Sequence, residues 1–307
     1  MTARIGIDVG GTAIKLGLVL PGGRIAARAR LDLPREGGLP ALVAILGAAC
    51  RDLEARAGQR ASRIGVSTPG FTDAGSGQLL DGGNNVPALR EGSLRNALAE
   101  SLGRPVAVNN DGVAAAVGEL RHGAGARFRR FVLLTLGTGV GGAVVLEGRV
   151  VTGSRGEPPE LGALVLDAAG PPNRQGLPGT LEHFACAGAF LDAYRGSVTP
   201  PSLPELFARL GTDPQAAAAV DAVCGRIAQA LGGLVSALNL EACLLGGGVA
   251  AAGAPLRDAV AAQLPRFTWP LQRGRVEVLL AETGNDAGLL GAAALASPEP
   301  AAALLAG

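Results

Sequence analysis

A pattern of strand, glycine turn and strand occurs twice in this chain, and it restricts the fold more than any other feature. Ile5–Val19 reads IGIDVGGTAIKLGLV, and LLTLGTGVGGAVVL at Leu133–Leu146 repeats the pattern about 125 residues later. On both sides of the glycines, apolar residues alternate with small or polar ones, which predicts β-strands. This weak internal repeat predicts two similar lobes, each built on a hairpin.

The segments after each hairpin alternate between helical and strand patterns. We expect helices at 39–58, 93–103, 112–123, 180–193, 204–210, 214–239, 255–264 and 284–296. We expect further strands at 63–68, 105–110, 242–246 and 276–281, and a loop at 153–179. This alternation is typical of an α/β protein.

Charge and cysteine content exclude several classes of protein. The formal net charge is +1, and no large Lys/Arg block occurs, so no nucleic-acid or acidic-membrane partner is expected. The four cysteines are scattered, which indicates free thiols in a reducing, cytoplasmic environment rather than a disulfide framework. No uncharged apolar run reaches the roughly 18–20 residues of a membrane helix.

The glycine turns do not fit the common nucleotide motifs. GTGVGG matches the Gly-x-Gly-x-x-Gly dinucleotide fingerprint, but a strand follows it, where that fingerprint requires a helix. A glycine hairpin presents backbone N–H groups to anions, and Thr12 and Thr138 add hydroxyl donors. One such hairpin would be merely a tight turn. Two matched hairpins predict a site for polyphosphate.

Four polar residues near expected strand or loop ends are candidates for catalysis or substrate binding. Asn110 and Asp111 lie at the end of an expected strand, where the pattern fits both a helix N-cap and a base that accepts a hydroxyl proton. Glu160 and Glu182 flank the expected loop, and each could accept hydrogen bonds from sugar hydroxyls or lie on a solvated surface. His122 and His183, the only histidines, do not suggest a metal site.

The order and spacing of these motifs resemble the ROK family of bacterial sugar kinases. The matching segments are IGIDVGGTAIKLGLV, VAVNNDGVAAAVGE, LLTLGTGVGGAVVLEG, PPELGA, GTLEHFACAGA and LLGGGVA. The resemblance implies an α/β fold of the actin-like/sugar kinase/Hsp70 ATPase superfamily, with two actin-like (ribonuclease H-like) lobes and an interdomain cleft. The expected lobes are residues 1–119, joined by the C-terminal helix 284–307, and residues 120–283.

The resemblance also implies a role for each matched position. Asp111 corresponds to the general base that activates the sugar 6-hydroxyl. The implied sugar-binding residues are Gly70, Asn85, Asn110, Glu160 and Glu182. The implied ATP-binding residues are Asp8, Gly10, Gly11, Thr12, Thr138, Gly139, Gly247 and Gly248, with the last two covering adenosine.

The chain departs from the family pattern in one place. The family holds a structural zinc with one histidine and three cysteines, and the corresponding residues here are Ala163, Asn173, Gln175 and Thr180. We therefore expect no zinc. Because the family histidine also touches the sugar, its replacement by Ala163 leaves the identity of the hexose open.

The resemblance implies an enzyme that phosphorylates glucose with ATP and Mg²⁺, in the cytoplasm and as a homodimer. A kinase for N-acetylmannosamine, N-acetylglucosamine or fructose is the first alternative. A non-catalytic, sugar-sensing ROK protein is the second. ROK-like repressors carry an N-terminal helix-turn-helix, and the expected first strand already begins at Arg4.

Overall fold

The computed structural model describes residues 2–73, 75–195, 202–297 and 304–306, and these form two compact units. The first unit contains residues 1–127, 148–159 and 285–307, and the second contains 128–147 and 160–284. The boundary expected at residues 119 and 120 falls within helix α3 (Asp111–His122), which belongs to the first unit. Part of the expected C-terminal range, 284–307, lies outside the described residues.

The first unit is built on a five-stranded mixed sheet with the order β3-β2-β1-β4-β7. β1, β2 and β3 are antiparallel, whereas β1, β4 and β7 run parallel. The strands are Arg4–Val9 (β1), Ala13–Val19 (β2), Ile25–Asp32 (β3), Arg63–Thr68 (β4) and Val106–Asn110 (β7). The two alternating runs around the first glycine turn are therefore adjacent strands of one hairpin, as predicted.

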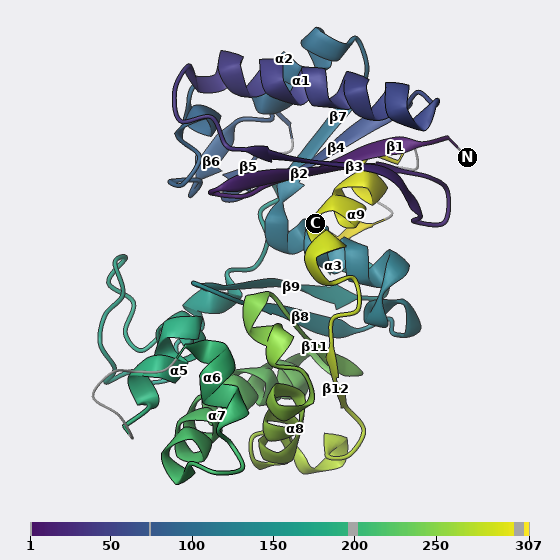
Figure 1. The fold of residues 1–307 in the computed structure, drawn as a ribbon. Helices are drawn as coiled ribbons and strands as arrows, with labels where there is room; N and C mark the ends of the chain where they lie inside the picture. The colour runs from purple at the N-terminus through teal and green to yellow at the C-terminus, as the bar shows by residue number, and fades with distance from the viewer. Residues whose placement is uncertain (1, 74, 196–201, 298–303, 307) are drawn as a thin grey trace. The chain divides into compact units, whose positions relative to one another are not determined.

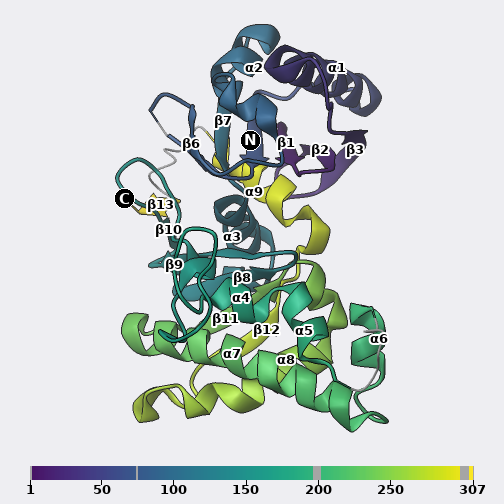
Figure 2. The ribbon, with the colours of Figure 1, turned by 90° about the vertical axis from the view of Figure 1, so that its left-hand side faces the viewer.

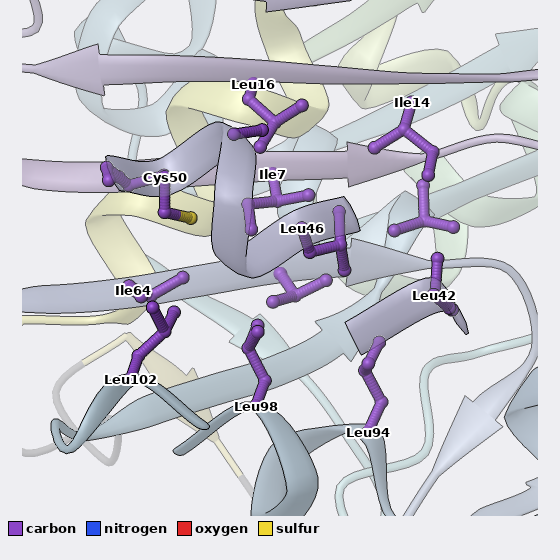
Figure 3. Close-up of a cluster of buried hydrophobic side chains, with 14 of the residues drawn as sticks. Ile7, Ile14, Leu16, Leu42, Leu46, Cys50, Ile64, Leu94, Leu98 and Leu102 are labelled. Atoms are coloured by element: carbon purple, nitrogen blue, oxygen red, sulfur yellow. The ribbon is translucent and has the colours of Figure 1, made fainter. Parts of the chain in front are cut away.

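Helices α1 (Gly38–Ala57) and α2 (Leu94–Leu102) cover one face of this sheet (Figure 1). The period of two in a strand directs alternate side chains of β1 toward these helices, where Ile5 and Ile7 are fully buried. Figure 3 shows how apolar side chains of both helices interlock with those of the strands, and Cys50 is part of this core.

Helices α3 and α9 (Ala287–Leu295) lie on the opposite face (Figure 1). Glycines make this layer unusually close. A methyl group at Gly6 of β1 or Gly65 of β4 would collide with backbone carbonyls of α9. Where the two helices meet, a methyl group at Gly118 or Gly291 would collide with the backbone of the other helix. Backbone therefore packs on backbone, and only glycine fits at these contacts.

The first unit also contains small elements. The sequence did not predict the two-stranded hairpin of β5 (Phe71–Thr72) and β6 (Leu79–Asp81), because strands of two or three residues carry no measurable alternation. β10 (Arg149–Val151) pairs in parallel with β13 (Leu305–Ala306). Two 3₁₀ turns, η1 (Pro87–Arg90) and η2 (Ala124–Arg127), complete the unit.

The second unit contains the second glycine hairpin, which is formed by β8 and β9. Within it the order is β12-β11-β8-β9, with β8 and β9 antiparallel and the other pairs parallel. The strands are Phe131–Leu136 (β8), Val140–Leu146 (β9), Ala242–Gly246 (β11) and Glu277–Leu280 (β12). The repeat that the sequence predicted at the glycine turns is therefore confirmed as a repeat of structure.

Helices pack beside these strands. α8 (Ala254–Gln263) contacts β12, and the long α7 (Pro214–Leu238) packs against α8 (Figure 2). Three short helices each contact α7, namely α4 (Leu181–Ala185), α5 (Ala187–Ala193) and α6 (Leu203–Ala208). The segment 153–179, expected as a loop, contains one 3₁₀ turn, η3 (Leu161–Ala163), and isolated bridges.

Among the described helices, α7 is the one whose length and hydropathy would suit a membrane span. More than half of its most apolar window, 56%, is buried in the structure. Core helices of soluble proteins have the same properties, so α7 is weak evidence for a membrane span.

Candidate functional site

The first glycine hairpin exposes its turn. Gly10 N–H donates to the carbonyl of Ala13 at 3.0 Å, which closes the turn, while Gly11 and Thr12 remain exposed. A Cβ atom at Gly11 would lie 2.9 Å from Cβ of Asn85. The structure therefore places Asn85, a predicted sugar ligand, directly against the predicted phosphate turn.

Asp8 is held by two side chains that the sequence analysis did not single out. Its Oδ1 accepts a hydrogen bond from Ser67 Oγ at 3.1 Å, and its Oδ2 lies 3.4 Å from Lys15 Nζ. Lys15, the only lysine in the chain, also donates to the carbonyl of Asn285 at 3.2 Å. The Asp8 side chain is 20% exposed, so this anchored carboxylate can still meet a ligand.

Asn110 and Asp111 divide the two roles that their pattern left open. Asn110 is the N-cap of α3: its Oδ1 accepts from the N–H groups of Gly112 at 2.8 Å and Val113 at 3.3 Å. Its Nδ2 donates to the carbonyl of Gly70 at 2.9 Å. Since the capping is done by Asn110, Asp111 as the first helical residue has a carboxylate that is not needed as the cap.

The carboxylate of Asp111 has an unusual electrostatic environment. The side chain is accessible to water, yet protein atoms surround it densely at longer range. This desolvation raises the pKa of Asp111, and the negative charge of Asp8 raises it further, against the opposing hydrogen bond from Gly112 N–H. A carboxylate with a raised pKa is a stronger proton acceptor, which suits a general base.

The second glycine hairpin holds one of the predicted sugar residues. Its turn is closed by Gly137 N–H, which donates to the carbonyl of Gly139 at 2.9 Å, and Thr138 is exposed. Glu182 Oε2 accepts a hydrogen bond from Val140 N–H at 3.0 Å. A Cβ atom at Gly139 would lie only 2.5 Å from that same carboxylate oxygen.

The segment that carries Glu160 also approaches Glu182. Glu160 is exposed and immediately precedes η3. Within η3, a Cβ atom at Gly162 would lie 3.5 Å from Cβ of Glu182. Ala163, which we expected to replace a histidine, ends this turn and is half-buried. The second unit therefore brings the two predicted glutamate segments together.

The segment that we expected to lack zinc ligands is held together by the side chain of Asn173. Asn173 Oδ1 accepts from the N–H groups of Gln175 at 3.0 Å and Leu177 at 2.9 Å. Asn173 N–H donates to the carbonyl of Leu177 at 2.8 Å, and Gly179 N–H to that of Pro171 at 2.9 Å. Across residues 2–73, 75–195, 202–297 and 304–306, no three His, Cys, Asp or Glu side chains form a group suited to a metal.

The predicted adenosine loop borders a mostly apolar pocket. Gly247 has φ of 79°, and a side chain there would collide with the backbone of Leu136. Gly248 faces open space and lines a pocket of about 390 Å³ in the second unit. Its other walls come from α6, η4 (Gly248–Ala252) and the start of α8. An apolar pocket with a bare backbone edge suits a flat purine ring.

The structure distributes the predicted residues between the two units. The first unit holds Asp8, Gly10, Gly11, Thr12, Gly70, Asn85, Asn110 and Asp111. The second unit holds Thr138, Gly139, Glu160, Glu182, Gly247 and Gly248. The sequence analysis missed three residues that donate hydrogen bonds to predicted site residues. Lys15 and Ser67 donate to Asp8, and Val140 donates to Glu182. The signal for Lys15 was available, because Lys15 and Asp8 are opposite each other if the hairpin turns at its glycines.

Comparison with known proteins gives consistent similarities over nearly the whole chain. The model of the ROK family matches residues 4–299. The chain is 33% identical to a glucokinase of Thermotoga maritima over 308 aligned positions, which cover 95% of this chain and 96% of the relative.

Two of the solved structures that share the fold are ROK kinases. One is the ROK hexokinase from Thermus thermophilus, with a TM-score of 0.84, 35% identity, and coverage of 96% of this chain and 97% of that one. The other is a ROK glucokinase from Streptomyces griseus in complex with glucose and AMPPNP, with a TM-score of 0.80, 27% identity, and coverage of 96% and 99%. The predicted α/β class with actin-like lobes is confirmed.

Proposed function

This chain belongs to the ROK family, and we propose that it is an ATP-dependent sugar kinase that converts glucose to glucose 6-phosphate. The observation that carries the proposal is the environment of the Asp111 carboxylate. Its carboxylate is accessible, it is not needed as the cap of α3, and its pKa is raised by desolvation and by Asp8.

In the proposed reaction, Asp111 acts as the general base. The 6-hydroxyl oxygen of the sugar forms a bond to the γ-phosphorus, and the bond from that phosphorus to the β–γ bridging oxygen breaks. The hydroxyl proton moves to the Asp111 carboxylate, and ADP is the leaving group. The N-terminal position on α3 keeps Asp111 fixed while the proton is transferred.

We propose that the two hairpins bind the phosphates of ATP. Gly10, Gly11 and Thr12 offer exposed backbone and a hydroxyl, as do Thr138 and Gly139. Gly247 and Gly248 would cover adenosine beside the apolar pocket. Mg²⁺ would arrive with the nucleotide and neutralise phosphate charge. An anchored carboxylate such as Asp8 is the kind of oxygen ligand that this ion prefers.

We propose that the sugar is bound by Gly70, Asn85, Asn110, Glu160 and Glu182. Asn110 uses its oxygen for the cap and one Nδ2 proton for Gly70, which leaves the second Nδ2 proton as a donor to a ring hydroxyl. Glu160 and Glu182 supply carboxylate oxygens that can accept from adjacent hydroxyls. Support for these roles comes from the exposure of both glutamates.

Coupled measurement of ADP release across a panel of sugars tests the proposal. The panel contains glucose, fructose, N-acetylmannosamine and N-acetylglucosamine, and Asp111→Asn is the control for background ATPase. We expect the highest kcat/KM with glucose. A higher value for another sugar would assign that sugar as substrate. Sugar binding without any ADP release would favour a non-catalytic sensor.

We also propose a cytoplasmic homodimer in which the two compact units are the two lobes of the enzyme. Its partners are small molecules, without nucleic acid, membrane or structural zinc. The modest net charge supports the absence of a nucleic-acid or membrane partner, and the scattered free cysteines support a reducing compartment. Light scattering of the purified protein measures the oligomeric state, and elemental analysis measures the zinc.

A further inference from the structure

A second pocket lies in the first unit, away from all the residues assigned to sugar or ATP. It has a volume of about 340 Å³. Its walls come from the start of β1, the turn between β2 and β3, the last turn of α3 and the second half of α9. None of the predicted site residues lines it. We refer to it as the basic pocket.

The charged groups of the basic pocket are all positive or able to become so. Arg4, Arg121 and His122 line it, and none of its described lining residues is acidic. The side chain of Arg121 makes no hydrogen bond or ion pair with any residue in the described part of the chain. Thr2 and Ser297 add hydroxyl groups. Guanidinium groups bind carboxylate and phosphate through paired hydrogen bonds, so this set is suited to an oxyanion.

The environment of His122 supports the same ligand. Burial lowers the pKa of His122, and the positive charge of Arg121 lowers it further. Gly23 packs on the imidazole, since a Cβ atom there would lie 2.5 Å from Nδ1. An anion in the pocket would offset the repulsion from Arg121 and favour the protonated ring. Arg4 and Arg121 are the only other charged residues in the described lining of the pocket.

The remaining lining residues limit the size and character of the ligand. Val19, Leu20 and Leu290 are apolar, and Gly22 faces open space. The volume matches a small metabolite and excludes a folded or polymeric partner. The chemistry that fits is a phosphate or carboxylate group on a short carbon skeleton.

The two helices that line the pocket also position the catalytic carboxylates. α3 begins at Asp111 and ends at His122. α9 begins beside Asp8, because a Cβ atom at Gly288 would lie 2.8 Å from its Oδ1, and Leu290 lies further along on the pocket. The backbone contacts at Gly118 and Gly291 lock the helices together. A ligand at one end of this pair therefore contacts two interlocked helices, of which α3 carries Asp111 and α9 packs against Asp8 of β1.

We propose that the basic pocket is a regulatory site for a small organic oxyanion, which binds at Arg121 and His122 and changes turnover through α3 and α9. The binding step is independent of the proposed function, whereas the effect on turnover rests on it. Arg121 and His122 also lie where basic residues stabilise the end of a helix, and the experiment separates this structural role from ligand binding.

Two histidines in the chain make the binding test specific. We would titrate the intact protein with inorganic phosphate, glycerol 3-phosphate and malonate, and follow the imidazole C–H signals by NMR. The signals of His122 should shift and its pKa should rise, while those of His183 in the second unit serve as the internal control. Stronger binding of phosphates than of malonate would identify the phosphate as the recognised group, and the reverse would identify the carboxylate.

Substitutions of Arg121 separate anion binding from stabilisation of the helix end. Arg121→Gln should weaken anion binding about tenfold, since a hydrogen bond to a charged group is lost. Arg121→Lys should retain part of it. Arg60→Gln, which removes an equal charge from the exposed surface of the same unit, should bind like the unchanged protein. Absence of any His122 shift with all three anions, or equal weakening by Arg60→Gln, would overturn the site.

Steady-state kinetics tests the regulatory half. With glucose and ATP saturating, the tightest-binding anion should change kcat of the unchanged protein, and Arg121→Gln should remove that change while keeping the basal kcat. Binding without a change in kcat would overturn the regulatory role alone. If no turnover occurs with any sugar, the proposed function fails, and the NMR titration still decides the binding site.

Discussion

Glu182 Oε2 accepts a hydrogen bond from the backbone N–H of Val140, at 3.0 Å. A residue proposed to bind the sugar is thereby attached to the hairpin proposed to bind phosphate. Gly139 makes the contact possible, because any side chain there would meet the same oxygen. Occupancy of the hairpin by nucleotide and the orientation of Glu182 are therefore physically connected.

Gly139→Ala should impair sugar binding without unfolding the protein. The new methyl group would lie 2.5 Å from Glu182 Oε2 and displace the carboxylate from Val140 N–H. Loss of a charged hydrogen bond predicts an increase of about tenfold in the KM for glucose. Gly137→Ala is the matched control in the same turn, since its methyl group would meet nothing within 4 Å. Similar KM values for the two variants would contradict the proposed link.

Asp111→Asn should lose most of its turnover and keep its fold. An amide cannot accept the hydroxyl proton, and general-base catalysis contributes about 10²–10⁴-fold to the rate. The cap of α3 is unaffected because Asn110 supplies it. Steady-state measurement of kcat, with glucose affinity measured separately by calorimetry, tests this. A variant with nearly normal kcat would show that Asp111 is not the base.

The same substitution should stabilise the protein at neutral pH. Because the pKa of Asp111 is raised in the folded state, the native protein retains a proton at pH values where the unfolded chain has lost it. The free energy of unfolding therefore falls as the pH rises from the ordinary aspartate value of 3.8 through the raised pKa. Asp111→Asn lacks this penalty.

Urea denaturation of both proteins between about pH 4 and pH 8 measures the effect. The stability advantage of Asp111→Asn should grow with pH and then level off above the raised pKa. If the variant is less stable than the unchanged protein at pH 7, the ionised carboxylate is stabilised in the fold and the assigned direction of the pKa shift is wrong.

The side chain of Asn173 should stabilise the protein, whereas we expect zinc to make no contribution. Asn173→Ala removes the acceptor of two backbone hydrogen bonds and should lower the free energy of unfolding by about 1–2 kcal/mol. Asn173→Asp keeps an acceptor and should restore most of it. Gln175→Ala is the neighbouring control, because the Gln175 side chain makes no hydrogen bond with the described residues.

Chelation completes that test. EDTA, added with Mg²⁺ held constant, should leave the melting temperature unchanged, because Ala163, Asn173, Gln175 and Thr180 include no thiolate or imidazole. About one zinc per chain, or a lower melting temperature after chelation, would show that other residues have taken over the site.

Periodic patterns made much of the fold predictable. The hairpins at Gly10–Thr12 and Gly137–Gly139 could be predicted because alternating runs flank glycines that only a turn explains. The long helix at Pro214–Leu238 was predicted because 25 residues carry many turns of apolar spacing. By contrast, the hairpin of Phe71–Thr72 and Leu79–Asp81 depends on a few backbone hydrogen bonds, and no periodic signal reports it.

Contacts between distant parts of the chain were the least predictable part of the site. The sequence identified Asp111 and Glu182, but it could not show that Glu182 meets Val140, 42 positions earlier. The division of roles between Asn110 and Asp111 depends on where α3 begins, and a difference of one residue reverses it. Asn173 carried a local signal, because asparagine commonly caps turns, but its position suggested only the loss of a zinc ligand.

The close packing of α9 on Gly6 and Gly65 has a consequence for how this protein is made. A ribosome releases β1 and β4 early, yet the helix that covers their glycine face emerges only after all the residues of the second unit. The residues of the second unit are all synthesised before α9, so that unit is able to mature first. The amino-terminal unit is complete only after α9 has been synthesised, and a message that stops short of residue 287 yields a chain whose first sheet lacks α9 on its glycine face.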